Sequence, residues 1–248
     1  MNKIDSKTET IFSHAVALEQ SGRLRNTIYA GKKEVYVLNS DSTVILRFKS
    51  SSVFKNPISF KASDYESKSF YEKNGKIIFV TENEGMIREK SCKTIDMDFN
   101  SIKAIFDGME LKIVNKVIIN KSILPLLDEN LSHIEISSVD KVLKITQRNI
   151  YDGTVIDITK ERAKGFGFVN KDVIKKDIKP IGMRTNDFIA LFSFNNEIEF
   201  QLSNKKGFCF FKGRNFNMKG ILALCLYDEL GIIENNSKPV KSKRRRKK

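Results

Sequence analysis

Hydrophobic and polar positions alternate in an order that recurs along the chain. The clearest instance covers residues 186–226, where one apolar helix pattern is followed by three strand patterns. Phe188 and Phe192 have the i, i+4 spacing of a buried helix face, whereas Ile198 and Phe200 alternate as in a half-buried strand. This pattern predicts a unit of one helix and several strands, and we expect four such units in the chain.

Four segments carry the helix pattern that identifies each unit. Ser6 with Glu9, and Ser63 with Glu66, match the capping box that begins many helices. Pro125 is tolerated only near the start of a helix, so the third helix should be short. The predicted helices cover residues 6–21, 63–71, 121–129 and 187–194.

Strand patterns fill most of the remaining sequence, and Phe and Ile, which favour half-buried sheets, are abundant. We therefore expect an α+β protein with many strands. Residues 100–109 are less regular and are interpreted as the link between two halves. The expected organisation is an N-terminal domain over 1–109, a C-terminal domain over 110–236 and a disordered basic tail over 237–248. Strands are predicted at 27–30, 34–38, 43–48, 53–60, 76–81, 85–90, 93–99, 111–119, 132–136, 142–147, 154–158, 197–202, 207–212 and 218–226.

The formal charge of +14 is concentrated in the last residues. The tail holds eight cations and no acid, which leaves +6 for residues 1–236. A run of like charges repels itself and attracts polyanions, and it predicts binding to nucleic acid first and to a membrane surface second. A signal for transport to a cellular compartment would look the same.

The sequence contains none of the usual catalytic patterns. With two histidines, His14 and His133, it offers no pair of metal ligands and no evident base for a nucleophile. It has no phosphate-binding loop and no nucleophile elbow. Asp96 and Asp98 alternate along a strand pattern and could hold a divalent cation, but no third acid accompanies them. We expect neither an enzyme nor a cofactor.

Cysteine use and hydropathy suggest an intracellular protein. Three cysteines, an odd number, lie far apart in apolar strand patterns, and we expect reduced, buried thiols. No apolar run approaches the ~18 residues of a membrane-spanning helix, and the first residues lack a secretory pattern. A soluble protein that does not enter membranes is expected.

One short motif indicates a different function. Residues 164–170, with the sequence KGFGFVN, resemble the RNP1 signature of RNA-recognition motifs, whose aromatic residues stack on bases. The eighth position, however, is Lys171 rather than an aromatic residue. The partner strand expected a few dozen residues upstream is also missing.

The order of elements resembles that of a known family. Residues 25–44, after the first helix pattern, are similar to the first hairpins of the DNA polymerase sliding clamps, in the short two-domain form of large tailed bacteriophages. Residues 120–127 resemble the first helix of that family's second domain, and residues 211–224 resemble its last two strands. The similarity covers residues 5–228 as a pattern without an invariant motif, and the basic tail is no feature of the family.

The resemblance implies a fold and a function. Each domain would have the DNA-clamp fold with two helix-plus-sheet repeats, and the helices would line a ring with the sheets outside. Six domains form such a ring, so two-domain chains imply a homotrimer. The ring would encircle double-stranded DNA and tether a replicative DNA polymerase after a clamp loader places it, as a processivity factor in DNA replication without catalysis. It would act in the cytoplasm or, for a viral protein, in the host cytoplasm or an intracellular replication compartment.

The same resemblance suggests functional residues. Cations near the four helices and in the tail would contact DNA phosphates without reading sequence. Partner segments would dock in an apolar groove near the link and the C-terminus. The candidates for DNA binding are Lys7, Arg23, Arg25, Lys68, Lys73, Lys116, Lys121, Arg184, Lys243, Arg244, Arg245 and Arg246. Those for partner binding are Ile105, Phe106, Leu226 and Tyr227.

Two other functions remain compatible with the sequence. A nucleic-acid-binding protein of another fold could use its Phe-rich strands to stack on RNA or single-stranded DNA. A virion structural protein could assemble through its strands and neutralise packaged nucleic acid with its tail.

Overall fold

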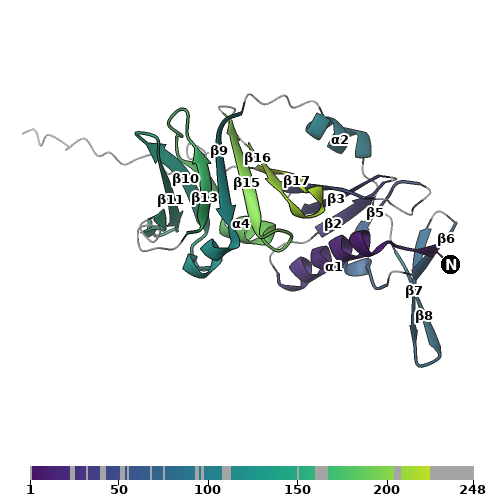
Figure 1. The fold of residues 1–248 in the computed structure, drawn as a ribbon. Helices are drawn as coiled ribbons and strands as arrows, with labels where there is room; N and C mark the ends of the chain where they lie inside the picture. Colours follow the sequence, from purple (N-terminus) through teal and green to yellow (C-terminus); the bar gives the residue numbers. More distant parts are fainter. Residues whose placement is uncertain are drawn as a thin grey trace, which may run out of the picture.

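The chain folds into four consecutive units, each built from a strand, a helical segment and three further strands (Figure 1). The first unit comprises β1 (Asn2–Lys3), α1 (Ser6–Gln20), β2 (Asn26–Ala30), β3 (Glu34–Asn39) and β4 (Val44–Lys49). The second comprises β5 (Ile58–Lys61), the 3-10 helix η1 (Ala62–Asp64), β6 (Ser69–Lys73), β7 (Lys76–Asn83) and β8 (Met86–Ser91). This computed structural model describes residues 2–22, 26–31, 33–39, 43–50, 54, 56–67, 69–74, 76–92, 95, 98–107, 113–149, 151–159, 167–203 and 208–223.

The second half of the chain repeats this order after helix α2 (Phe99–Asp107). The third unit comprises β9 (Ile113–Asn120), the 3-10 helix η2 (Lys121–Leu126), β10 (His133–Val139), β11 (Val142–Arg148) and β12 (Val155–Asp157). The fourth comprises β14 (Ile181–Arg184), α4 (Thr185–Leu191), β15 (Glu197–Ser203), β16 (Phe208–Gly213) and β17 (Lys219–Ala223). An additional strand, β13 (Val169–Val173), precedes it, and η3 (Asn215–Asn217) connects its last two strands.

Paired units exchange their first strands. β1 of the first unit pairs with β6 of the second, while β5 of the second pairs with β2 of the first. In the other half, β9 pairs with β15, and β14 pairs with β10. In each pair, each unit thus contributes its first strand to the sheet of the other unit. The exchange is confined to residues 2–91 in one half and 113–223 in the other.

The two halves are joined by one continuous sheet. Its nine strands have the order β13-β9-β15-β16-β17-β4-β3-β2-β5, and we call it the central sheet. The join is the antiparallel pairing of β17 with β4, in which Ile221 is opposite Ile45. Two smaller sheets, with the orders β1-β6-β7-β8 and β12-β11-β10-β14, flank it. In both smaller sheets the last strand of a unit, β8 or β12, stands at the edge.

The main core lies between the central sheet and the helical segments α1 and α4, which occupy the same side of that sheet in Figure 1. Phe12 of α1 and Phe200 of β15 are among its fully buried rings. A second cluster lies on the other face of the sheet, where Ile102 and Phe106 of α2 cover Tyr36 and Ile45. The central sheet is therefore covered on both faces near the join. We call the face bearing α2 the outer face.

The first helix begins one residue earlier than its capping box suggests. Asp5 is the N-cap, and its carboxylate accepts hydrogen bonds from the backbone N–H groups of Lys7 and Thr8 at 3.1 and 3.0 Å. An aspartate at this position satisfies donors that the helix leaves unpaired and interacts favourably with the helix dipole. The predicted stop at Gly22 agrees with its φ of 72°, a left-handed conformation that glycine adopts without strain.

The helix predicted over residues 63–71 is wrong. A short 3-10 turn, η1, stands there instead, and β6 takes up its second part. Phe70 is fully buried with its ring centroid 4.9 Å from that of Phe54, while its neighbour Tyr71 is half-buried on the other side of the strand. Alternation of this kind, together with pairing to β1, favours the strand.

The link between the halves is a helix rather than irregular chain. The carboxylate of Asp98 accepts hydrogen bonds from the N–H of Asn100 at 3.0 Å and from the hydroxyl of Ser101. These bonds start α2, and Ile102 and Phe106, four residues apart, then share its buried face. Phe99, which was expected to be the last residue of the strand over 93–99, is instead the first residue of α2.

Candidate functional site

Helical segments from both halves meet on the inner side of the central sheet, which is the side opposite to the outer face. The ring centroid of His14 on α1 lies 5.4 Å from that of Phe194, just after α4. Burial lowers the pKa of His14, and the positive charge of Lys121 on η2 lowers it further. The imidazole is therefore neutral at pH 7. We call α1, η2 and α4 the helix layer; it spans the junction between the halves.

Few cations occur on the solvent side of this layer. Lys7 is partly buried on α1, and Lys121 is exposed at the start of η2. The exposed side chains of α1 carry no charge, while the half-buried Glu9 and Glu19 are acidic, and this surface offers little to sequence-specific recognition. Its exposed residues, at the spacing of one helix face, are Ser6, Ser13, Ala17 and Gln20.

Two other cations predicted to bind DNA lie away from the helix layer. Lys116 precedes the buried Val117 on β9, so its side chain projects from the outer face, where its Nζ lies 3.7 Å from Glu199 Oε1. Lys73 is exposed at the end of β6, on the side of the strand opposite to the buried Phe70. The structure does not bring these two lysines together with Lys7 and Lys121.

Arg184 takes part in a polar cluster that connects the two halves. Its Nε donates to Asp187 Oδ2 at 2.9 Å, and its Nη2 donates to Thr43 Oγ1 at 2.5 Å. The hydroxyl of Thr43 in turn donates to Asp187 Oδ2 at 3.1 Å and accepts from Asn39 Nδ2 at 2.7 Å. We call these four residues the junction cluster. No sequence pattern indicates Thr43, whereas the i, i+3 spacing of Arg184 and Asp187 could have indicated their ion pair.

Arg47 holds α2 against the outer face. Its guanidinium pairs with Glu34 and, at 3.1 Å, with Asp107 at the end of α2. It also lies 5.7 Å from the ring centroid of Phe106 and 6.0 Å from that of Tyr36, within the range of cation–π contact. Burial, together with the hydrogen bond to Glu34, raises the pKa of Tyr36 well above its usual value. Sequence reasoning singled out Phe106 but missed Arg47, because its partners come from two other segments, β3 and α2.

The other predicted residues lie wholly or partly outside the described part of the chain. Ile105 lies within α2, but its side chain is outside the described residues. The remaining predicted residues that are outside the described part of the chain are Arg23, Arg25, Lys68, Leu226, Tyr227, Lys243, Arg244, Arg245 and Arg246.

One edge strand of each small sheet carries exposed apolar side chains, as does the end of the β10–β11 hairpin at Val139 and Val142. Met86 and Ile87 on β8 are 70% and 69% exposed. Val155 and Ile156 on β12 are 47% and 41% exposed. An exposed strand edge with apolar side chains is a ready template for pairing with another chain.

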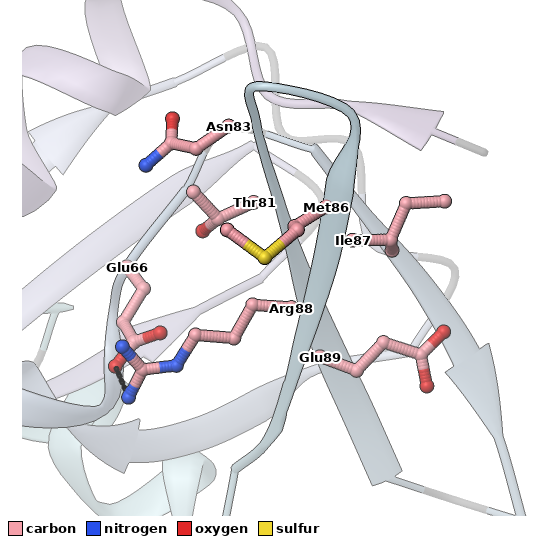
Figure 2. Close-up of a pocket in the computed structure, with 7 residues that line it drawn as sticks. All are labelled: Glu66, Thr81, Asn83, Met86, Ile87, Arg88 and Glu89. Carbon is pink, nitrogen blue, oxygen red and sulfur yellow. Dashed lines mark ion pairs between the residues drawn. The ribbon is translucent and has the colours of Figure 1, made fainter.

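A hollow of about 710 Å³ lies beside β8 (Figure 2). Glu66 enters it opposite Arg88, and its carboxylate lies 3.8 Å from Arg88 Nη2 and 3.1 Å from Lys90 Nζ. Figure 2 shows Met86, Thr81 and Asn83 on the same side of the hairpin as Arg88, with Ile87 and Glu89 on the other side. The hollow is open and has no buried acid, base or nucleophile, so it does not resemble a catalytic pocket.

The described residues provide no catalytic or metal-binding group of the usual kinds. Cys92 and Cys209 are buried, and burial raises the pKa of each thiol to about 12, so neither forms a nucleophilic thiolate at neutral pH. No cluster of three potential metal ligands occurs among them. None of the helices in this part of the chain has the length and apolar character needed to cross a membrane.

The RNP1-like motif does not form a base-stacking surface at Phe168. This residue is fully buried in the main core, and its carbonyl oxygen accepts a hydrogen bond from the N–H of Asn120 at 2.8 Å. A stacking platform needs an exposed ring. Phe166, the other aromatic residue of the motif, lies outside the described residues.

Comparison with solved structures identifies the architecture. Over 86% of this chain and 96% of the other, the fold matches a chain of the PCNA2–PCNA3 complex from Sulfolobus tokodaii, with a TM-score of 0.56 and 7% identity. Proliferating cellular nuclear antigen from Entamoeba histolytica matches over 88% of this chain and 96% of its own, with a TM-score of 0.55 and 10% identity. The chain has the PCNA clamp fold. No protein-family model and no curated protein sequence matches it.

The α+β clamp fold predicted from the sequence is thereby confirmed. The clamp fold accounts for the four-unit order and for a sheet that continues from one half into the other. At identities of 7% and 10%, the likeness concerns the fold and transfers no individual residue.

Proposed function

We propose that this protein is a DNA sliding clamp, a ring that encircles duplex DNA and tethers a replicative DNA polymerase without catalysis of its own. The observation that carries this proposal is the position of the last strand of each of the four units. Two of them, β4 and β17, pair with each other inside the chain. The other two, β8 and β12, stand at sheet edges and expose apolar side chains.

Pairing of β8 from one copy with β12 of the next would repeat the internal join. The internal join pairs β4, the last strand of the first unit, with β17, the last strand of the fourth unit. The remaining two units, the second and the third, end in β8 and β12. The rotation between successive copies would then resemble the rotation between the two halves of one chain. Copies related in this way close into a ring when the rotations add up to a full turn. By the resemblance to two-domain clamps, the ring contains three copies, with domains at 1–109 and 110–236.

In such a ring the helix layer would face DNA. Lys7 and Lys121 are the described cations best placed to meet phosphates, with Arg23, Arg25 and Lys68 as further candidates. Contacts with phosphates alone allow sliding, because they do not depend on base sequence. Lys73, Lys116 and Arg184 are weaker candidates, since they project elsewhere or belong to the junction cluster.

The basic tail would add a second, electrostatic contact with DNA. It carries eight cations, including Lys243, Arg244, Arg245 and Arg246. Deletion of residues 237–248 should weaken DNA association at low salt and leave the ring intact, because a screened electrostatic contact contributes most where salt is scarce. Equal retention of the shortened protein across a salt series would contradict this role.

Partners of the ring would bind its outer face. A polymerase and a clamp loader are the partners we propose, with Phe106 and Ile105 of α2 and the segment around Leu226 and Tyr227 as candidate contacts. An intracellular place of action and an origin in a tailed bacteriophage belong to the same proposal.

Two measurements test the proposal directly. Light scattering should give a mass of three chains in solution. When the protein is assembled on nicked circular DNA, it should stay bound at salt concentrations at which it leaves linear DNA, because a ring slips off free ends. A stable monomer or a large open assembly would contradict the ring, as would equal retention on linear and circular DNA.

A further inference from the structure

Three cations on three adjacent strands form a line across the central sheet. Lys212 on β16 is opposite Lys219 on β17, and Lys219 is opposite Arg47 on β4. Directly opposed residues project from the same face, and neighbouring strands are about 4.8 Å apart. Backbone pairing therefore holds the three charges side by side. We call them the cation line.

The cation line lies on the outer face. Phe211, next to Lys212, is buried in the main core with its ring centroid 6.3 Å from that of Phe200. Because successive side chains of a strand alternate, Lys212 projects in the opposite direction, away from the helix layer. Both Lys212 and Lys219 are exposed. Their ammonium groups are thus available to a molecule outside the sheet.

Within the described part of the chain, the charge is balanced at the Arg47 end of the line. Arg47 pairs with Glu34 and Asp107, whereas no ion pair joins Lys212 or Lys219 to a described acid. Like charges directly opposed across two strands destabilise a sheet. The pair of Lys212 and Lys219 therefore carries a repulsion that an anion above it would convert into attraction.

The nearest acid in register is engaged elsewhere. Glu199 on β15 is opposite Lys212. Its Oε1 lies 3.7 Å from Lys116 Nζ on the far side and accepts a hydrogen bond from Gln201 Nε2 at 2.5 Å. Glu199 thus directs its charge toward β9 rather than toward the cation line.

An apolar line runs parallel to the cation line, two residues along each strand. Phe210 is opposite Ile221, and Ile221 is opposite Ile45. Phe210 is partly exposed, while α2 covers the Ile45 end. A molecule lying over both lines would meet positive charge on one side and apolar surface about 7 Å away on the other.

We propose that the cation line binds an acidic segment of a partner protein, with carboxylates above Lys212 and Lys219. Two glutamates at i and i+4 of a helix are about 5–6 Å apart, which matches the spacing of neighbouring strands. Apolar residues on the adjoining helix face would then lie toward Phe210. As a statement about a polymerase-tethering ring, this inference rests on the proposed function; the binding surface itself does not.

The surface suits a peptide better than nucleic acid. A phosphate backbone would use the charges but would leave the apolar line unmatched. In the proposed ring, moreover, the outer face points away from the encircled DNA. Electrostatic complementarity with an acidic peptide uses both lines together and would favour fast, salt-dependent association.

The test uses a fluorescent synthetic helical peptide with Glu at i and i+4 and with Leu and Phe on the adjoining face. The full-length protein should bind it, and a peptide with Gln in place of both Glu should bind about tenfold more weakly. The double variant Lys212→Gln/Lys219→Gln should lose a similar factor. The matched control, Lys144→Gln/Lys175→Gln, removes two exposed cations elsewhere and should bind as the wild type does.

A second variant tests whether lost binding could result from unfolding. In Lys219→Glu the new carboxylate would lie between Lys212 and Arg47, which favours the folded sheet while abolishing the anion site. Unchanged peptide binding by this variant, or equal binding of the Glu and Gln peptides, would overturn the proposal, as would displacement of the peptide by a short DNA duplex. Light scattering on the same samples reports the ring separately, so either proposal can fail alone.

Discussion

Thr43 donates a hydrogen bond of 3.1 Å to the carboxylate of Asp187, a residue 144 positions later in the chain. The bond crosses from the first half of the molecule to the second. It uses the single hydroxyl proton, while both oxygen lone pairs accept, from Asn39 at 2.7 Å and from Arg184 at 2.5 Å. Asp187 is only 3% exposed, so its charge depends on these partners. The junction cluster thus fixes the orientation of α4 relative to the β3–β4 hairpin.

Replacement of this hydroxyl should destabilise the protein. Thr43→Val keeps the shape of the side chain but leaves Asp187 with fewer donors, and the free energy of unfolding should fall by about 1–2 kcal/mol. Urea unfolding measures this change. Thr10→Val is the control, because Thr10 Oγ1 donates to Ser6 O in an exposed position; its effect should stay within about 0.5 kcal/mol. Equal losses for the two variants would contradict a special role of the junction cluster.

Removal of the Arg47 guanidinium should loosen α2. Arg47→Met retains much of the apolar side chain but breaks the ion pairs with Glu34 and Asp107 and the contact with Phe106. We expect limited proteolysis to cleave residues 98–107 several-fold faster, with little change in the global unfolding transition. Arg88→Met, which removes an exposed ion pair with Glu66, should not alter cleavage at α2. Protection that persists in Arg47→Met would show that apolar packing alone holds the helix.

A charge on β8 should prevent ring assembly. Ile87→Lys is compatible with the monomer, because the residue is 69% exposed and lies opposite Glu82. In the proposed interface, however, it would bury an unpaired ammonium group, and association should weaken at least about tenfold. Light scattering should then report single chains. Val139→Lys, at an equally exposed hairpin end outside the edge strands, should leave the mass unchanged.

Charge reversal in the helix layer should weaken DNA retention. The variant Lys7→Glu/Lys121→Glu should leave circular DNA at lower salt and show a shallower dependence of affinity on salt, because fewer counterions are released. The comparison is Lys73→Glu/Lys144→Glu, which changes the net charge equally on strand faces away from the helix layer. Identical salt curves for the two variants would count against DNA passing along the helix layer.

Both histidines should make the protein less stable in mild acid. Burial lowers the pKa of His14 and of His133, with contributions from the positive charges of Lys121 and Arg184 respectively. The unfolded chain, with a pKa of about 6.5, therefore binds more protons than the folded chain below that pH. Stability is fully present above about pH 6.5 and is lost as the pH falls through the lowered pKa values. The variant His14→Gln/His133→Gln should lose less stability between about pH 7 and pH 5 in urea unfolding.

The sequence predicted those parts of the fold that local periodicity determines. The apolar stripe of α1, with Ile11, Phe12 and Ala15 all buried, and the alternation of Ile198 and Phe200 on β15 were both recognisable. The second helical segment was not, because the short stretch at Ala62–Asp64 has no apolar stripe and β6 forms through its distant partner β1. Pairing between strands far apart in sequence leaves little trace in either strand alone.

The candidate site was predictable only in part. Composition and helix positions pointed to Lys7 and Lys121, which lie on α1 and η2 of the helix layer. They also pointed to Lys116, but its direction depends on which strand face is buried, and a shift of one residue reverses it. The junction cluster and the Arg47 contacts depend on pairs that are 60 or more positions apart, and no spacing rule links Thr43 to Asp187 or Arg47 to Asp107.

The exchange of first strands between paired units sets the smallest piece of chain that can fold. A single unit would lack the strand that completes its sheet, and its own first strand would have no sheet to join. The two units of a pair should therefore gain and lose structure together, and a single unit cut from the chain would complete its sheet only by exchanging first strands with a second copy. The covalent connection between paired units thus replaces an association between copies with contacts inside one chain.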